Sequence, residues 1–117
     1  MHLGVALAKT FRDRPSGLIE TTEDAVVRAF LGSGNDDCTA AIDATNPGIS
    51  AEAFRADLLD FRARVQAFPN FGTFYPTGDL HTWLSGDGFY DCTAGGVRLR
   101  DWFAKIAAGE SPGHAGP

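Results

Sequence analysis

His81 stands in a short polar loop that directly follows an aromatic, strand-like run. The run reads FGTFYPT and the loop begins GDLHTWL. Histidine exchanges protons near neutral pH, and hydrolases keep a catalytic base of this kind in loops at the ends of strands. Asp79 lies in the same loop, where a short carboxylate is more typical of loop capping than of catalysis. His81 is therefore the candidate base.

A second group of ionisable residues follows the other predicted strand. The segment GLIETT leads into ETTED, which contains Glu20, Glu23 and Asp24. Reactive groups of open α/β sheets gather at the carboxyl ends of parallel strands, so an acid from this loop can meet His81. A carboxylate that holds an imidazole in one tautomer, together with that imidazole, makes two of the three members of a Ser-His-Asp triad. Each of the three carboxylates is a candidate for the acid.

A nucleophile for this pair is not evident in the sequence. In α/β-hydrolases the serine precedes the acid and stands on a G-x-S-x-G turn between a strand and a helix. Only Ser16 precedes the candidate acids, and it lies just before a predicted strand. The later serines also lack a glycine two residues away on each side; they are Ser33, Ser50, Ser85 and Ser111. The nucleophile is therefore expected outside this sequence.

Hydrophobic periodicity predicts four helices and two strands around these loops. The helices are expected at 3–12, 23–31, 51–68 and 96–108, and the strands at 17–22 and 70–77. Thr21 or Thr22 is expected to cap the second helix, and Ser50 the third. Residues 32–49 are predicted to be mostly loop.

Strands that alternate with helices favour parallel pairing, which is typical of the α/β class. Two strands are too few for a stable parallel sheet, so the pattern predicts one edge of a larger, incomplete sheet. Apolar residues at helical spacing are expected to form the buried faces of the third and last helices. They are Phe54, Leu58, Phe61 and Val65, and then Leu99, Trp102, Phe103 and Ile106.

Two segments resemble the pectinacetylesterase-like family, whose broader relatives include plant pectin acetylesterases and Notum-type carboxylesterases. In that family a strand leads to a Gly-x-x-His-Thr motif, then to Phe-Tyr and a Gly-Val-Arg-x-x-Asp-Trp helix. The matching residues are Gly78, His81, Thr82, Phe89, Tyr90, Gly96, Val97, Arg98, Asp101 and Trp102. The segment FRDRPSGLIETTEDAVVRAFLG is similar to the family's aspartate segment, with Asp24 matching the acid and Val27 replacing a frequent Gln. The resemblance covers nearly the whole chain, but only about the last third of a family member.

The resemblance implies the C-terminal part of an α/β-hydrolase fold, with residues 1–109 in the domain and 110–117 as a flexible tail. It implies hydrolysis of a small ester or an acetylated carbohydrate, without a metal or organic cofactor. His81 would be the base and Asp24 the acid, with Glu23 and Glu20 as alternatives. The serine and the oxyanion donors would lie outside this chain. The chain by itself is then expected to be inactive.

Composition narrows the classes of partner. A net charge of −5 with only ten Lys and Arg residues argues against nucleic-acid binding, which needs clustered basic side chains. No apolar run approaches the roughly 20 residues of a membrane-spanning helix. The sequence does not determine the cellular compartment, because a preceding region could carry an export signal. Cys38 and Cys92 fit either reduced thiols or one disulfide, and two cysteines without a histidine cluster do not predict zinc.

Two other interpretations fit the same sequence. In one, the chain is a stand-alone scaffold or interaction module without catalysis, and its open sheet edge is covered by self-association or by a partner. In the other, a separate chain supplies the serine. A stable, monodisperse protein without esterase activity favours the module. A neighbouring reading frame that encodes G-x-S-x-G favours the second chain.

Overall fold

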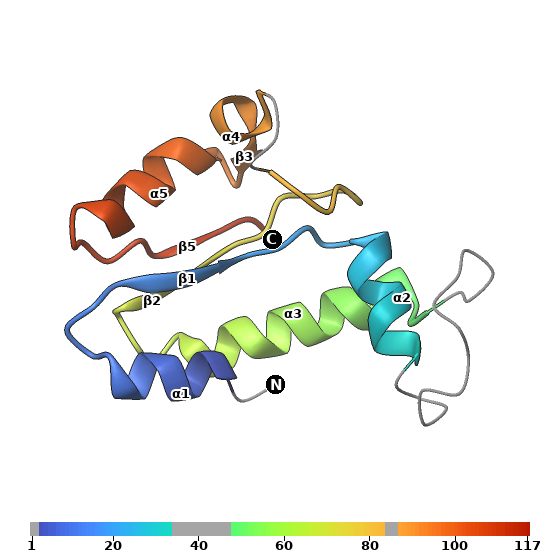
Figure 1. The fold of residues 1–117 in the computed structure, drawn as a ribbon, viewed down its shortest axis with the longest axis horizontal. Helices are drawn as coiled ribbons and strands as arrows, with labels where there is room; N and C mark the ends of the chain where they lie inside the picture. The colour runs from blue at the N-terminus through green and yellow to red at the C-terminus, as the bar shows by residue number, and fades with distance from the viewer. Residues whose placement is uncertain (1–2, 34–47, 84–86) are drawn as a thin grey trace.

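The computed structural model describes residues 3–33, 48–83 and 87–117. Within these ranges the chain forms a mixed α/β unit around a small parallel sheet (Figure 1). With β2 in the middle, the strands of this sheet are β1 (Ser16–Ile19), β2 (Phe71–Phe74) and β5 (His114–Ala115). The predicted α/β class and the parallel pairing of the first two strands are confirmed. Most of the predicted loop at 32–49, with Cys38, lies outside the described residues.

Helices lie on both faces of the sheet, as Figure 1 shows. α1 and α3 cover one face, α5 and the short α4 cover the other, and α2 follows the carboxyl end of β1. The helices are α1 (Leu3–Thr10), α2 (Ala25–Ser33), α3 (Ala51–Val65), α4 (Gly88–Asp91) and α5 (Leu99–Ala107). An antiparallel hairpin separates the last two helices; it consists of β3 (Thr93–Ala94) and β4 (Val97–Arg98).

α3 forms largely as the sequence predicts. The Oγ of Ser50 accepts a hydrogen bond of 3.1 Å from the N–H of Ala53 and so caps the first turn. All four expected apolar side chains are buried: Phe54, Leu58, Phe61 and Val65. The helix ends at Val65 rather than at residue 68. Phe68 is excluded from the helix because the residue before a proline is disfavoured in helical conformation.

The last helix begins later than predicted. Gly95 and Gly96 have φ angles of +55° and +79°, a region that favours glycine, and they form the turn of the β3–β4 hairpin. α5 therefore starts at Leu99. Trp102 is buried as expected, whereas Phe103 is 44% exposed, so its expected burial is wrong.

The parallel sheet contains one strand more than the two that were predicted. Within residues 110–117, predicted to be a flexible tail, His114 and Ala115 pair with Thr73 and Phe74 of β2. Two residues carry little pattern of their own, so this strand depends on contacts with residues distant in the sequence.

Arg62 of α3 provides several of those contacts. Its guanidinium donates hydrogen bonds of 2.8 Å to Thr73 Oγ1 and to the Ala115 carbonyl, and it lies 4.4 Å from the centre of the Tyr75 ring. The Nδ1 of His114 is 3.0 Å from the same Thr73 hydroxyl. Arg62 thus joins α3, β2 and β5 on one face of the sheet.

Trp102 organises the opposite face. A Cβ added to Gly17 or Gly72 would lie 2.5 Å or 3.1 Å from atoms of the Trp102 ring, so these two glycines leave the space that the ring fills. The indole Nε1 donates a 3.0 Å hydrogen bond to the Gly113 carbonyl. The packing of Trp102 therefore couples α5 to all three strands of the sheet.

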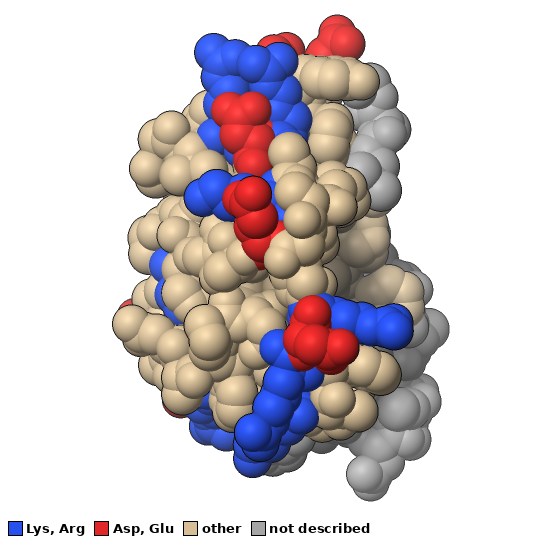
Figure 2. Space-filling view, turned by 90° about the vertical axis from the view of Figure 1, so that its left-hand side faces the viewer, with Lys and Arg blue, Asp and Glu red and all other residues tan. Residues whose placement is uncertain are grey.

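Charged side chains of both signs are interspersed on the side of the molecule shown in Figure 2, toward the amino ends of β1 and β2. Lys and Arg alternate there with Asp and Glu and do not form one continuous basic surface. Among the described residues, no helix combines the length and apolar character needed to cross a membrane.

Candidate functional site

The segments that follow β1 and β2 run side by side beyond the sheet. The amide of Thr22 donates to the Pro76 carbonyl (3.1 Å), and the amide of Glu23 donates to the Gly78 carbonyl (2.9 Å). The hydroxyl of Thr21 donates to the Leu80 carbonyl (2.9 Å). These bonds extend the strand register into the two loops and fix the path of the chain toward residues 24 and 81.

Gly78 allows the second loop to turn. Its φ is +130°, a conformation that side chains with a Cβ rarely adopt, and open space surrounds the position of a Cβ. Asp79 and His81 lie after this turn, and Asp79 is exposed.

Asp24 caps α2 and is fully buried. One carboxylate oxygen, Oδ1, accepts a 2.8 Å hydrogen bond from the N–H of Val27 in the first turn. The prediction of Thr21 or Thr22 as the cap is therefore wrong. Both threonines are buried where the two loops run side by side, and the helix begins at Ala25 instead.

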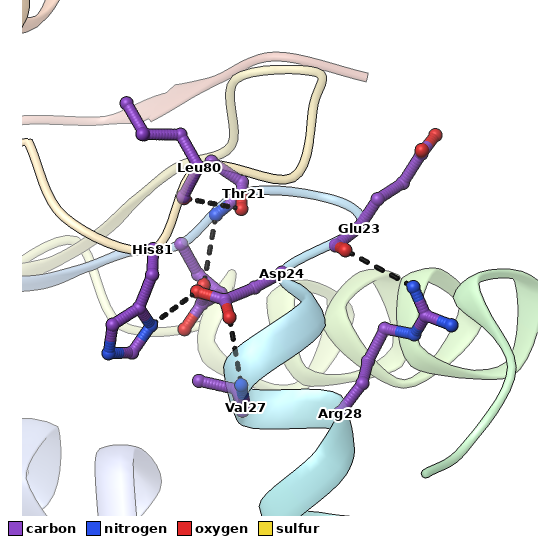
Figure 3. A network of polar contacts seen from close by, with 8 residues as sticks. Thr21, Glu23, Asp24, Val27, Arg28, Leu80 and His81 are labelled. Atoms are coloured by element: carbon purple, nitrogen blue, oxygen red, sulfur yellow. Dashed lines mark hydrogen bonds and ion pairs between the residues drawn. The ribbon is translucent and has the colours of Figure 1, made fainter. Parts of the chain in front are cut away.

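The second oxygen of Asp24 faces His81 (Figure 3). Asp24 Oδ2 lies 2.8 Å from His81 Nδ1, and the His81 side chain is 45% exposed. An ionised carboxylate only accepts hydrogen bonds, so Nδ1 carries the proton. In the neutral ring Nε2 then keeps its lone pair. The pair thus presents a half-exposed basic nitrogen whose orientation is set from a buried carboxylate.

The environment of Asp24 favours its ionised form. Burial raises the pKa of Asp24, but hydrogen bonds from the Val27 amide, His81 and Glu20 outweigh burial and lower the pKa overall. A capping carboxylate also gains from the positive end of the helix dipole. Asp24 is therefore an anion at neutral pH and can stabilise a protonated His81.

Glu20 and Glu23, the alternative acids, are placed differently from Asp24. The Oε1 of Glu20 accepts a 3.0 Å hydrogen bond from the Thr21 amide. Burial, followed by contact with Asp24, raises the pKa of Glu20 to about 7. Figure 3 shows the Glu23 carboxylate directed away from His81, and only the backbone carbonyl of Glu23 contacts Arg28. Asp24 is the acid that bonds to His81.

Three of the serines lie away from His81 in the structure. Ser16 begins β1 at the opposite end of the sheet, Ser50 caps α3, and Ser111 donates to the Pro69 carbonyl. Ser85 lies outside the described residues. Within the described ranges no hydrogen bond to His81 Nε2 is present, so this nitrogen is available to a group from another part of the protein.

In the part of the chain that the structure describes, two surface arginines and a buried cysteine make no hydrogen bond or ion pair with Asp24 or His81. Arg98 and Arg100 are exposed, and Arg100 lies 3.4 Å from Asp101. Cys92 is buried, and burial raises the pKa of its thiol. Among the described residues, no group of His, Cys, Asp and Glu side chains is suited to a metal ion.

Comparisons with known proteins add no relative. No family model, no curated protein and no solved structure matches this chain.

Proposed function

We propose that this chain is the C-terminal part of a serine-dependent carboxylic-ester hydrolase of the pectinacetylesterase-like type. The observation that carries the proposal is the 2.8 Å contact between buried Asp24 Oδ2 and His81 Nδ1, which leaves Nε2 available on a half-exposed ring. This is the relation between acid and base in a Ser-His-Asp triad. The order of acid before histidine is also that of α/β-hydrolases.

In the proposed reaction, His81 Nε2 accepts the proton of a serine hydroxyl as that oxygen attacks the ester carbonyl. The same nitrogen then gives the proton to the leaving alcohol, and a water molecule repeats the sequence to release the acid. Asp24 holds the Nδ1–H tautomer and stabilises the imidazolium. Backbone N–H groups elsewhere would stabilise the oxyanion. The serine and these donors would lie outside the 117 residues.

The proposed substrate is an acetyl or other short ester, including one carried by a carbohydrate. This part of the proposal follows from the family resemblance, which links the histidine segment to enzymes that remove acetyl groups.

The free edge of β1 supports the proposal that further polypeptide completes the site. Among the described residues β1 is an edge strand of the sheet, and apolar side chains line grooves beside it. They include Leu3, Leu7, Leu18, Leu31, Phe54 and Phe61. Exposed strand edges flanked by apolar residues tend to pair with another strand. The same edge also favours the second candidate function, a non-catalytic module that self-associates.

The test is to express the whole open reading frame that contains these residues, hereafter the full-length protein, and to treat it with a fluorophosphonate probe. Such a probe labels only a serine activated by a base. We expect one labelled serine, mapped by mass spectrometry to a peptide outside residues 1–117. His81→Ala should abolish the labelling. Glu23→Gln should leave it unchanged, since the Glu23 carboxylate is directed away from the site.

Labelling that survives His81→Ala would contradict the proposal. A folded full-length protein that is neither labelled nor active on p-nitrophenyl acetate would also contradict it. If this protein forms a stable dimer that is lost when Leu18 is replaced by Asp, the non-catalytic module is the better interpretation.

A further inference from the structure

The loop that carries His81 is held by few contacts. Residues 79–82 are all exposed, so apolar burial does not fix this segment in place. Two hydrogen bonds join it to other described residues. One is the contact between His81 and Asp24, and the other runs from the Thr21 hydroxyl to the Leu80 carbonyl (Figure 3). The position of the His81 backbone therefore depends on Thr21.

Thr21 is itself firmly placed. It is fully buried, its N–H donates to Glu20 Oε1 at 3.0 Å, and its hydroxyl donates to the Leu80 carbonyl at 2.9 Å. A β-branched side chain has few χ1 rotamers, so the direction of this hydroxyl is restricted. Leu80 directly precedes His81, and Thr21 lies three residues before Asp24. One buried side chain thus joins the segment of the acid to the segment of the base.

We propose that Thr21 is a positioning residue, whose hydroxyl holds the Leu80 carbonyl and thereby sets the position of His81 against Asp24. Asp24 is fixed separately, because it is buried and caps α2 by accepting from the Val27 amide. Without the Thr21 bond, the His81 backbone could move relative to this fixed carboxylate. Misplacement of a catalytic group by about 1 Å can cost about 100-fold in rate.

The catalytic meaning of the Thr21 bond rests on the proposed function. The bond itself, and its effect on the contact between His81 and Asp24, can be measured without a substrate. A failure of the proposed function and a failure of the positioning role can therefore be told apart.

Thr22 provides a matched control at the next position. It is also fully buried, but its hydroxyl has no hydrogen-bond partner among the described residues. Valine has nearly the shape of threonine and lacks the hydroxyl. Thr21→Val therefore removes a bond to the His81 loop, whereas Thr22→Val removes a hydroxyl without a described partner. Thr21→Ser keeps the hydroxyl and should preserve the bond.

The first test follows exchange of the His81 Nδ1–H proton with water, by NMR of the full-length protein at a pH where the ring is neutral. Exchange should be at least about tenfold faster in Thr21→Val than in wild type, because the loop opens more often. Thr21→Ser and Thr22→Val should both stay within about threefold of wild type. In wild type, the Thr21 hydroxyl proton should be protected from exchange and show a nuclear Overhauser contact to Leu80.

The second test is steady-state hydrolysis of p-nitrophenyl acetate. Thr21→Val should lower kcat about tenfold with KM unchanged, because the hydroxyl orients the base and does not touch the substrate. Thr21→Ser should restore most of the activity, and Thr22→Val should retain it. A purely structural role of Thr21 would lower stability and leave kcat of the folded enzyme unchanged.

Equal His81 exchange rates in the two valine variants would overturn the proposal. A Thr21 hydroxyl proton that exchanges freely in wild type would also overturn it, and this measurement decides even if Thr21→Val does not fold. An active enzyme in which Thr21→Val keeps its kcat would overturn the positioning role and leave the proposed function intact. Faster His81 exchange in Thr21→Val, in a protein without esterase activity, would support the Thr21 bond and refute only the proposed function.

Discussion

The two ends of the parallel sheet use polar side chains in opposite ways. At the amino end, the Asn70 amide group donates to the carbonyls of Ala8 (3.1 Å) and Phe11 (2.9 Å), which belong to the last turn of α1 and the residue after it. At the carboxyl end, Asp24 accepts from the first turn of α2 and also from His81. Both side chains tie a helix terminus to the sheet. Only the second arrangement uses groups that gain or lose protons.

This difference separates a structural contact from a candidate site. The Asn70 side chain is an uncharged amide whose donors are satisfied by backbone carbonyls, so it offers no group that exchanges a proton near neutral pH. Asp24 fixes His81 but leaves Nε2 available on a ring that is 45% exposed. The buried acid and the exposed base together make the carboxyl end suitable for proton transfer. The comparison predicts that substitutions at the two ends have separable effects.

The largest effect is expected from Asp24→Asn. The asparagine amide can still cap α2, but it no longer provides the negative charge that stabilises a protonated His81. In the full-length protein kcat for ester hydrolysis should fall by about 10⁴-fold, the loss typical when the acid of a triad becomes an amide. Steady-state kinetics on p-nitrophenyl acetate measures this loss. A drop of less than about tenfold would show that Asp24 does not serve His81 in catalysis.

The next largest effect is expected from Gly72→Ala near the amino end. The new Cβ would lie 2.3 Å from the Gly113 carbonyl oxygen and 3.1 Å from the Trp102 ring. Overpacking of this kind should lower the free energy of unfolding by about 3 kcal/mol, as urea denaturation would show. Gly88→Ala is the control, since its Cβ would meet Trp83 at an ordinary 3.5 Å. Equal stability of the two variants would contradict the close packing of Trp102 on β2.

A smaller effect is expected from Asn70→Ala. The carbonyls of Ala8 and Phe11 would lose their donor, which should cost about 1–3 kcal/mol in urea denaturation. Labelling by a fluorophosphonate should be unchanged in conditions where the variant remains folded. If Asn70→Ala instead abolishes labelling while the protein stays folded, the two ends are coupled and the distinction between them fails.

The smallest effect is expected in the pH dependence of stability. The pKa of Glu20 rises from its ordinary 4.5 to about 7 on folding, so the folded state keeps a proton that the unfolded state releases. The contribution of Glu20 to stability is present below about pH 4.5 and is lost as the pH rises toward 7. Glu20→Gln should flatten the decline in unfolding free energy between pH 5 and about 7.5. Glu23→Gln should keep the wild-type slope, and equal slopes for wild type and Glu20→Gln would refute this assignment.

The meeting of Asp24 and His81 could be anticipated because it depends on local signals. Each residue follows a recognisable strand, and the carboxyl ends of paired parallel strands lie together. Ser50 was likewise predictable as a cap, since a short polar side chain precedes a long amphipathic run. The prediction of a threonine cap on α2 was wrong because Asp24 caps a helix that starts at Ala25, while both threonines are buried between the two loops.

Features that depend on distant contacts could not be predicted. β5 has two residues and is held by β2 and by Arg62, which lies more than 50 positions earlier in the chain. The raised pKa of Glu20 likewise depends on its burial and on the proximity of the Asp24 carboxylate. Neither the burial nor the proximity can be predicted from the sequence ETTED. Such effects arise from tertiary packing rather than from local propensity.

The most direct test of the Asp24–His81 pair is the tautomer of His81, measured by ¹⁵N NMR of the ring nitrogens in the full-length protein. At a pH where the ring is neutral, we predict a proton on Nδ1 and a bare Nε2, because Asp24 Oδ2 accepts from Nδ1 at 2.8 Å. Asp24→Asn should remove this preference. A wild-type ring that carries its proton on Nε2 would contradict the account, since Nε2 could then not accept a proton from a serine.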